Sequence, residues 1–552
     1  MASESSGEFD RRPVVPERLL PARHFAASYA GEHVAGTEFV IGAMFVAWGV
    51  STSDVIGGLI LGNLLAVLSW ALLCAPLATN TRLTLYAYLE KIAGPSVIRL
   101  YSVINGIFFC ILGGAMITVS ASAVRILFDI PAQVHWYPSS FAFVLVALMV
   151  GAVVVTVAMR GFAIVARFAE ICAPWMILMF AAGAMALWPL LSDKAGVLPG
   201  TDFLDALWRV GDTYIWVESA DSEMTFWHVA AFAWICNLPM HMGLSDMTVL
   251  RFARRARYGW FSALGMYIGH FCAWICAGIM GAGAATLLNV EIESLDAGGV
   301  AFQALGSAGI VAVIIAGWTT SNPTIYRAGL AFQSLSTRWS RRQVTIITGV
   351  LTTIVACFPF VFSELMGFLG LMGLLLVPIG AIIIAEHWVF PRLGLTRYWS
   401  AYQRSHLNKP ALVAWLAALL FAWWLNSLGV HLFFLLVPAW LTAFVLYIAL
   451  AAAWGANGDY GELAQQDENN ERQRRQHEVS ALSQVVVEEA TKRLSLGARL
   501  CRTAAWLSLL GCAGMAWLVF SGWEHEWLRS WLIVPSVLYF IFATCWVQAK
   551  EA

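Results

Sequence analysis

Long apolar runs recur along almost the whole chain, and short polar or charged stretches separate them. An α-helix needs about 20 apolar residues to cross the hydrocarbon core of a bilayer. The pattern therefore predicts an all-α membrane protein with fourteen spanning helices, numbered here as spans 1 to 14. The spans cover residues 25–51, 54–78, 98–124, 139–159, 163–190, 226–249, 258–287, 307–334, 343–363, 366–389, 410–428, 431–454, 502–521 and 527–547.

The composition agrees with a polytopic membrane protein. Of the 552 residues, 60% are hydrophobic and 12% are charged, whereas about 25% of residues are charged in soluble domains. The net charge of −1 gives no reason to expect a nucleic acid partner. No HExxH, GxSxG or paired-carboxylate motif lies at a membrane face, so we expect no enzymatic activity. The expected partners are the lipid bilayer and a small-molecule substrate.

The basic residues divide by side of the membrane. If the N-terminus is cytoplasmic, 28 of the 33 Lys and Arg residues fall in cytoplasmic segments. This distribution obeys the positive-inside rule, so we expect both termini in the cytoplasm and the protein in the inner or plasma membrane. The outer segments 192–225 and 291–305 are acidic and contain two short helical patterns.

These assignments divide the chain into seven parts. They are a cytoplasmic segment 1–24, a five-helix repeat 25–190, an extracellular loop 191–225, a second five-helix repeat 226–389, spans 11 and 12 in 410–455, a cytoplasmic amphipathic segment 456–500 and a terminal hairpin 501–552. The part from 456 to 552 is also a candidate surface for homo-oligomerisation.

Span 8 carries a polar cluster where lipid would demand apolar residues. Four small polar residues, Thr319 to Asn322, precede Pro323 in the middle of the span. Polar groups at this depth need an ion, a solute or another polar helix as partner. Pro323 is itself a helix breaker. We therefore predict that this span forms a wall of a transport site. Arg327 either pairs with Asp246 in a gate or extends to the interface.

Spans 1 and 6 are interrupted at matching depths. Span 1 contains Gly36 and the carboxylate of Glu38, and span 6 contains Asn237, Pro239 and His241. Each of these spans opens a set of five helices, and the two run in opposite directions. Paired interruptions of this kind are typical of secondary transporters built from inverted repeats.

Four passages, in order, resemble the nucleobase-cation-symport-1 family of cytosine and purine permeases and hydantoin transporters. They are GVSTSDVIGGLILGNLLAVLSW with TNTRLTLYAYLEKIAG, then GFAIVARFAEICAPWMILM, WTTSNPTIYRAGLAF and PIGAIIIAEHWVFPR. The resemblance implies the leucine-transporter-type fold of five plus five inverted helices, here followed by extra helices 11 to 14.

The resemblance also implies positions for the ligands. A sodium site would use the carbonyls of Glu32, Ala35 and Ala316 with the hydroxyls of Thr319 and Thr320. Such oxygen ligands suit a hard cation. The substrate would contact Gly36, Thr37, Glu38, Phe109, Gly113, Asn237, His241 and Thr324. In relatives that bind flat heterocycles, tryptophans stand at the positions of Phe109 and Asn237.

The expected function is sodium-coupled import of a nucleobase-like or related small polar heterocycle by alternating access. The proton is the alternative coupling cation, because the mid-membrane carboxylate of Glu38 and the imidazole of His241 can exchange protons. Two other readings stay open: a channel or solute sensor on a transporter fold, and a symporter of a vitamin or an amide.

Overall fold

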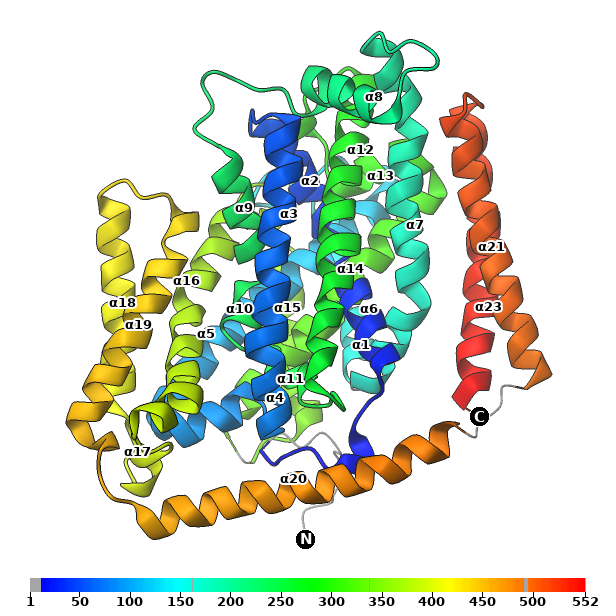
Figure 1. Ribbon diagram of the computed structural model, residues 1–552. Helices are drawn as coiled ribbons and strands as arrows, with labels where there is room; N and C mark the ends of the chain where they lie inside the picture. The colour runs from blue at the N-terminus through cyan, green and yellow to red at the C-terminus, as the bar shows by residue number, and fades with distance from the viewer. Residues whose placement is uncertain (1–10, 161, 337, 491–494, 552) are drawn as a thin grey trace.

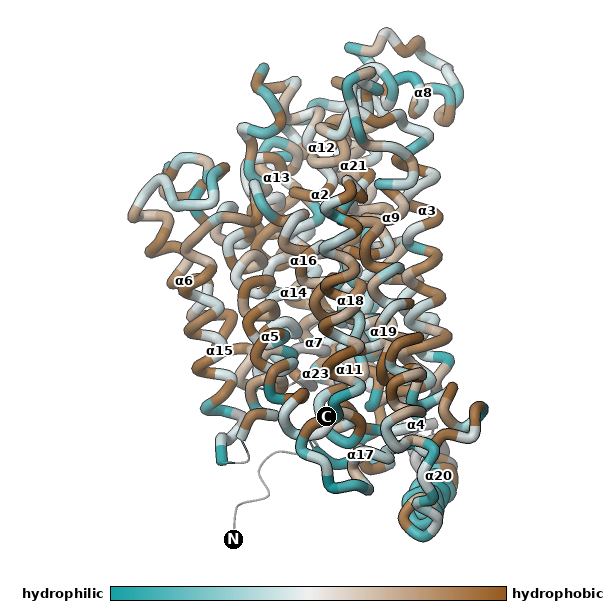
Figure 2. The backbone as a smooth tube through the Cα atoms, turned by 90° about the vertical axis from the view of Figure 1, so that its left-hand side faces the viewer, coloured by the Kyte–Doolittle hydropathy of each residue, from teal (hydrophilic) through white to brown (hydrophobic). Residues whose placement is uncertain are grey.

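The computed structural model describes residues 11–160, 162–336, 338–490 and 495–551. Within these ranges, eleven helices are long and apolar enough to cross a membrane, and three shorter apolar helices accompany them. Together they coincide with the fourteen predicted spans. Figure 2 shows hydrophobic residues along the middle of the bundle and hydrophilic residues at its ends.

The first five spans form one set of helices (Figure 1). Its members are α1 (Ala22–Glu32) and α2 (Thr37–Ala47) in span 1, α3 (Thr52–Ser69) and α4 (Ala75–Thr81) in span 2, α5 (Leu85–Val124), α6 (Phe141–Ala158) and α7 (Phe162–Lys194). A π-helical turn, Trp70–Cys74, joins α3 to α4.

Spans 6 to 10 form the second set. Its members are α9 (Phe226–Ile235), α10 (Leu238–His241) and α11 (Met247–Leu250) in span 6, α12 (Cys272–Leu288) with the π-helical segment Leu264–Phe271 before it, α14 (Ser307–Gln333), α15 (Arg341–Ala356) and α16 (Leu365–Ile384). The all-α fold with five plus five helices agrees with the expectation from the sequence.

Both opening spans are broken. Span 1 is non-helical over residues 33–36, between α1 and α2. Span 6 leaves helical geometry at 236–237 and again over 242–246, where Leu244 has a φ of 64°. Breaks of this kind release backbone donors and acceptors from the helix ladder, and these groups need partners inside the protein.

One local prediction differs from the structure. Span 3 begins earlier than expected, because α5 starts at Leu85 and kinks at Gly94, whose φ is 81°. Span 8 keeps its helix at Pro323, because α14 is continuous through this residue. A proline inside a helix costs one backbone hydrogen bond and a steric clash, and the tertiary packing of this fully buried segment outweighs that cost.

Two short helices, α8 (Phe203–Val210) and α13 (Ala297–Leu305), lie outside the spans. The predicted surface helix within 291–305 is in fact largely buried, since six of the nine residues of α13 are inaccessible. Its N-cap Asp296 accepts two hydrogen bonds from the Arg125 guanidinium at the end of α5, at 2.7 and 2.8 Å.

Four further helices cover the outside of the bundle. They are α18 (Lys409–Ser427) and α19 (Leu436–Ala451), which pack with α16, and α21 (Leu496–Phe520) and α23 (Ile533–Glu551), which pack with α7. The terminal pair is held to α7 by polar contacts inside the apolar interface. Trp175 donates to Ser536 at 2.9 Å, and Tyr539 donates to the carbonyl of Ile171 at 2.6 Å.

One long polar helix, α20 (Gly461–Ala490), runs across the end of the bundle at which the N-terminus lies (Figure 1). Glu478 pairs with Arg82 at the end of α4, and Asp467 accepts a hydrogen bond from Tyr402 in α17 (Trp399–Tyr402) at 3.0 Å. The helix therefore connects the span 2 end to the segment after span 10. Homo-oligomerisation through 456–552 stays a prediction.

The break in span 6 depends on a glycine of α16. A Cβ on Gly380 would lie 1.7 Å from the carbonyl oxygen of Met242. We expect Gly380→Ala to lower the thermal unfolding midpoint of the purified protein, because α16 and the broken segment would have to separate. Gly367→Ala is the matched control on the same helix, since no atom lies within 4 Å of its added Cβ. Equal midpoints for the two variants would contradict this packing.

Candidate functional site

A small cavity of about 40 Å³ lies where the break in span 1 meets α14 and the break in span 6. Seven of the residues predicted to bind ligands line it: Glu32, Ala35, Thr37, Glu38, Asn237, Thr320 and Thr324. The share of liquid volume of one water molecule is about 30 Å³. In this conformation the cavity has room for an ion or a water molecule but not for a heterocycle.

The other predicted residues lie behind the cavity wall. Gly36 packs closely against Val119 and against the backbone of Gly317, and Phe109 is fully buried. Gly113 faces Thr352 and Thr324. These three do not line the cavity. From α5, the apolar side chains Leu112 and Met116 line it instead.

The imidazole of His241 also points elsewhere. Its Nε2 lies 3.1 Å from the carbonyl of Trp234, and its ring packs against Trp70 at 4.6 Å between centroids. It contacts neither Glu38 nor the cavity in the described structure. The pairing of Glu38 with His241 considered from the sequence is therefore not formed.

Four of the five groups predicted to bind sodium are linked by hydrogen bonds beside the cavity, whereas the fifth, the Ala35 carbonyl, accepts the amide of Glu38. The Thr320 hydroxyl donates to the Glu32 carbonyl across the helices at 3.0 Å, and it also lies 3.3 Å from the Ala316 carbonyl. The Thr319 hydroxyl donates to the same Ala316 carbonyl at 3.0 Å. This donor set of hydroxyls and carbonyls has the chemistry that a hard monovalent cation requires.

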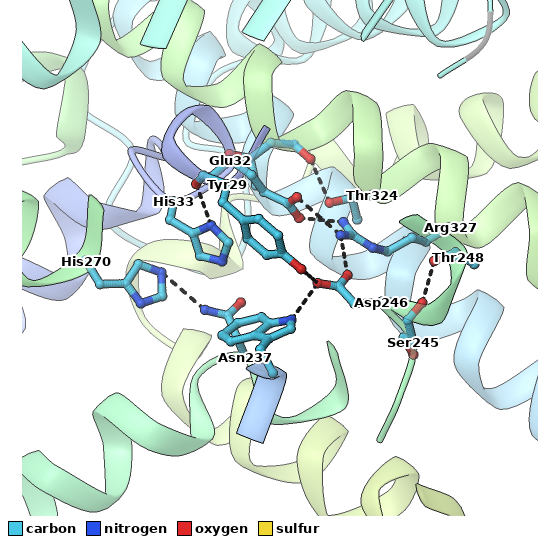
Figure 3. Close-up of polar contacts among 12 residues, drawn as sticks. Tyr29, Glu32, His33, Asn237, Ser245, Asp246, Thr248, His270, Thr324 and Arg327 are labelled. Carbon is cyan, nitrogen blue, oxygen red and sulfur yellow. Dashed lines mark hydrogen bonds and ion pairs between the residues drawn. The ribbon is translucent and has the colours of Figure 1, made fainter. Parts of the chain in front are cut away.

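A buried network of charges adjoins this oxygen cluster through Glu32 (Figure 3). Arg327 of α14 is 1% exposed. It pairs with Glu32 at the end of α1 at 2.5 Å and with Asp246 before α11 at 2.7 Å. We call these three residues the charge triad. The sequence indicated the pairing of Arg327 with Asp246 as one of two options, and the structure adds Glu32.

Two aromatic side chains complete the hydrogen bonding of the triad. Tyr29 of α1 and the indole of Trp70, at the junction of α3 and α4, both donate to Oδ2 of Asp246, at 3.1 and 2.7 Å. Asp246 therefore has hydrogen bonds at both oxygens, as a buried carboxylate requires. The sequence showed no sign of this role, because tyrosine and tryptophan are frequent throughout the spans.

A second polar cluster surrounds Glu38 at the cavity. The indole of Trp274 in α12 donates to the carboxylate of Glu38. The Nε2 atom of His270 lies 3.6 Å from the Glu38 carboxylate and 3.2 Å from the Asn237 amide. The rings of His270 and Trp274 stack at 4.4 Å. Neither His270 nor Trp274 is among the ligand-binding residues predicted from the sequence.

A larger cavity of about 300 Å³ lies between α2, α13 and the start of α16. It is mostly apolar, with Phe39, Val40 and Met44 on one side and Phe362 opposite. Leu365, the first residue of α16, lines both this larger cavity, which we call the vestibule, and the central cavity. The two spaces therefore meet at this side chain.

Removal of the arginine from the charge triad tests its contribution. We expect Arg327→Gln to lower the thermal unfolding midpoint strongly, because two buried carboxylates lose their cation, a loss of about 3–5 kcal/mol for a broken buried pair. The added substitution Asp246→Asn should recover part of the loss. Arg475→Gln, which breaks the half-exposed pair with Glu471, is the control and should change little. A single Arg327→Gln variant as stable as this control would contradict the burial of the triad.

Comparisons with known proteins bear on the fold. No family model matches the chain. The cytosine permease of Escherichia coli K12 is 27% identical over 139 residues, which are 25% of this chain and 31% of the permease. Mhp1, a nucleobase-cation-symport-1 family transporter in a closed conformation with bromovinylhydantoin bound, superposes with a TM-score of 0.63 at 15% identity. This match covers 83% of this chain and 98% of Mhp1.

Two further solved structures have the same fold. The inward-facing conformation of Mhp1 gives a TM-score of 0.60 at 15% identity, over 82% of this chain and 96% of that one. A Na⁺-coupled sialic acid symporter in a substrate-bound outward-open state gives 0.56 at 16% identity, over 79% and 90%. The fold is that of these membrane transporters, and the resemblance to the nucleobase-cation-symport-1 family indicated by the sequence is confirmed.

Proposed function

We propose that the protein is a cation-coupled secondary symporter that imports a small polar solute, a nucleobase-like or related heterocycle, by alternating access. The observation that supports this most directly is the hydrogen bond between the Thr320 hydroxyl and the Glu32 carbonyl. It joins α14 to the break in span 1 at the edge of the central cavity. A cation placed there would hold the two helices together and shape one wall of the solute site.

The coupling cation of this proposal is sodium. The cluster offers the hydroxyls of Thr319 and Thr320 with the carbonyls of Ala316 and Glu32. The carbonyl of Ala35 now accepts the amide of Glu38 and lines the same cavity. The charge triad next to it contains two carboxylates and one guanidinium. Its single excess negative charge favours a cation at this place and disfavours an anion.

The solute would bind on the outer side of the cation, between Thr37, Glu38, Asn237 and Thr324. The carboxylate and the amide can accept and donate hydrogen bonds along the edge of a heterocycle. The name of the cytosine permease and the bromovinylhydantoin bound to Mhp1 support a flat N–H-bearing ring. The cavity must widen to admit such a ring, and displacement of Leu365 would join it to the vestibule.

Opening of the cavity toward the cytoplasm requires the residues of the charge triad to separate. Its pairs connect α1, α14 and the inner part of span 6, so these elements cannot move apart while the pairs persist. A cation at the Thr320 cluster and the triad would both stabilise the conformation that is closed on this side. The cation and the solute then bind cooperatively, because each of them favours the same conformation.

In the proposed location, the protein lies in the inner or plasma membrane. Both termini then lie in the cytoplasm. The two chain ends lie at the same end of the bundle (Figure 1). The polar helix α20 and the arginines that it contacts lie there as well. This arrangement supports the orientation expected from the distribution of basic residues.

Loss of the Thr320 hydroxyl tests the cation site. We expect Thr320→Ala to raise the sodium concentration for half-maximal cytosine uptake into proteoliposomes at least about tenfold, which corresponds to roughly 1.4 kcal/mol. Ser321→Ala is the control, because Ser321 donates only to the Trp318 carbonyl of its own helix. Uptake that is independent of sodium in the unmodified protein, or unchanged sodium dependence in Thr320→Ala, would refute the site.

A further inference from the structure

The long helix α20 faces the bundle with a stripe of polar side chains. Four of its residues recur at intervals of three and four positions, which places their side chains on one face of the helix. They are Asp467, Glu471, Arg474 and Glu478, and each of them contacts a group outside α20. Ion pairs and hydrogen bonds therefore attach this helix to the spans, whereas the face of a permanently packed helix is usually apolar.

One end of the stripe is attached to the ends of spans 2 and 6. Glu478 pairs with Arg82, the C-cap of α4, which is 1% exposed. The guanidinium of Arg82 also donates to the carbonyls of Arg251 and Ala253, which follow α11. Arg82 therefore holds the ends of the two spans together, and Glu478 connects α20 to both of them.

The other end of the stripe is attached to the segment after span 10 and to the start of α5. Glu471 accepts a hydrogen bond from Tyr398 at 3.1 Å, and Asp467 accepts one from Tyr402 at 3.0 Å. The hydroxyl of Tyr398 lies 3.3 Å from that of Tyr88, in the first turn of α5. The short helix α17, which contains Tyr402, also packs with α5. This end of α20 is therefore connected to α5.

The two ends of α20 lie on different sides of a division in the bundle. α5 packs with α14, and near its start Tyr86 donates to the carbonyl of Arg327 at 3.4 Å. Arg327 is the residue of the charge triad that comes from α14, and its partners belong to spans 1 and 6. The triad thus connects α14 to spans 1 and 6, and α20 connects α5 to spans 2 and 6. Two separate sets of polar contacts cross the same division.

The contacts of α20 are of a kind that can release. The side chains of Glu471 and Glu478 are 22% and 14% exposed, so water competes for them. Most of the side chains described in α20 are exposed, and ion pairs that reach the surface stabilise less than buried ones. An element held in this way opens at a lower free-energy cost than the core of the spans. α20 can therefore detach while the spans stay folded.

We propose that α20 is an inhibitory clasp. While it is docked at both ends, it holds spans 2 and 6 to α5 and α14, and it thereby restrains the opening of the cavity toward this end of the bundle. Release of either end of α20 removes the restraint and leaves the charge triad as the contact that crosses the division. The effect of the clasp on transport rests on the proposed symport function, whereas its docking and its restraint on opening do not.

Hydrogen exchange tests the clasp without any transported solute. The regions to compare are α20 and the breaks of spans 1 and 6, at residues 33–36 and 242–246. In the purified protein in nanodiscs, we expect Glu478→Gln to raise amide exchange in both regions at least about threefold, because a detached helix and an opened cavity lose protection. Faster exchange in α20 alone, or no change in either region, would overturn the proposal.

A second variant separates a clasp from a local effect on Arg82. Glu471→Gln loosens the opposite end of α20, where the carboxylate of Glu471 contacts Tyr398. We expect it to raise exchange at the two breaks as Glu478→Gln does, because a clasp fails when either end is released. An increase in Glu478→Gln without one in Glu471→Gln would show that Glu478 acts only through Arg82, and the clasp would be rejected.

Glu468→Gln is the matched control, because it makes the same change of side chain on the same helix. Glu468 is exposed and forms no hydrogen bond or ion pair with the residues that the structure describes. Its exchange at α20 and at the two breaks should equal that of the unmodified protein. An increase in this control as large as that in Glu478→Gln would show that loss of any charge on α20 is sufficient, which would contradict the role of the two docked ends.

A transport assay measures the consequence of release. With cytosine as the solute in proteoliposomes, we expect the initial uptake rates of Glu478→Gln and Glu471→Gln to exceed that of the unmodified protein at least about twofold, because the opening step becomes faster. Glu468→Gln should match the unmodified protein. Equal or slower uptake in both clasp variants would overturn the inhibition. If cytosine enters with none of these proteins, the substrate assignment fails, and the exchange experiment alone decides whether α20 is a clasp.

Discussion

The junction of α1, α14 and the segment before α11 depends on the pairing of Arg327 with Glu32 and Asp246. Each of these charges would be very costly alone in a dry interior, and together they become tolerable because every one has an opposite charge and hydrogen bonds. The three residues come from α14, α1 and the segment before α11. A contact made for electrostatic reasons therefore also holds these three parts of the chain together.

In the broken helices, the uncharged backbone groups also need partners in the interior of the protein. The breaks at 33–36 and 236–237 expose backbone atoms at a depth where lipid offers no partners. Nearby hydroxyls and side-chain amides, and the ligands we propose, are the groups that can satisfy them. The cavity thus forms around backbone groups that need hydrogen-bond partners. Its polar character comes from these peptide groups as much as from the side chains around it.

The chemistry of the cavity differs from a site built on aromatic stacking. Asn237 lines it, Phe109 does not, and the tryptophan that approaches Glu38 comes from α12 with its indole N–H directed at the carboxylate. In the function we propose, hydrogen bonding along the edge of the solute would have the larger share in recognition. A carboxylate at this position favours solutes with N–H donors, because a buried acceptor without a donor is costly.

The sequence by itself determined the number of spans, the two interrupted helices and the polar face of span 8, because hydrophobic runs and helix-breaking residues are local properties. It also identified Glu38, Asn237 and Thr320 as residues that need partners. Only the tertiary structure decided which partners they have. It moved His241 away from Glu38, brought His270 and Trp274 to it, and joined Glu32 to Arg327 across 295 positions of the chain. Such pairings depend on how helices rotate and pack against one another, and the order of residues within a helix leaves that rotation undetermined.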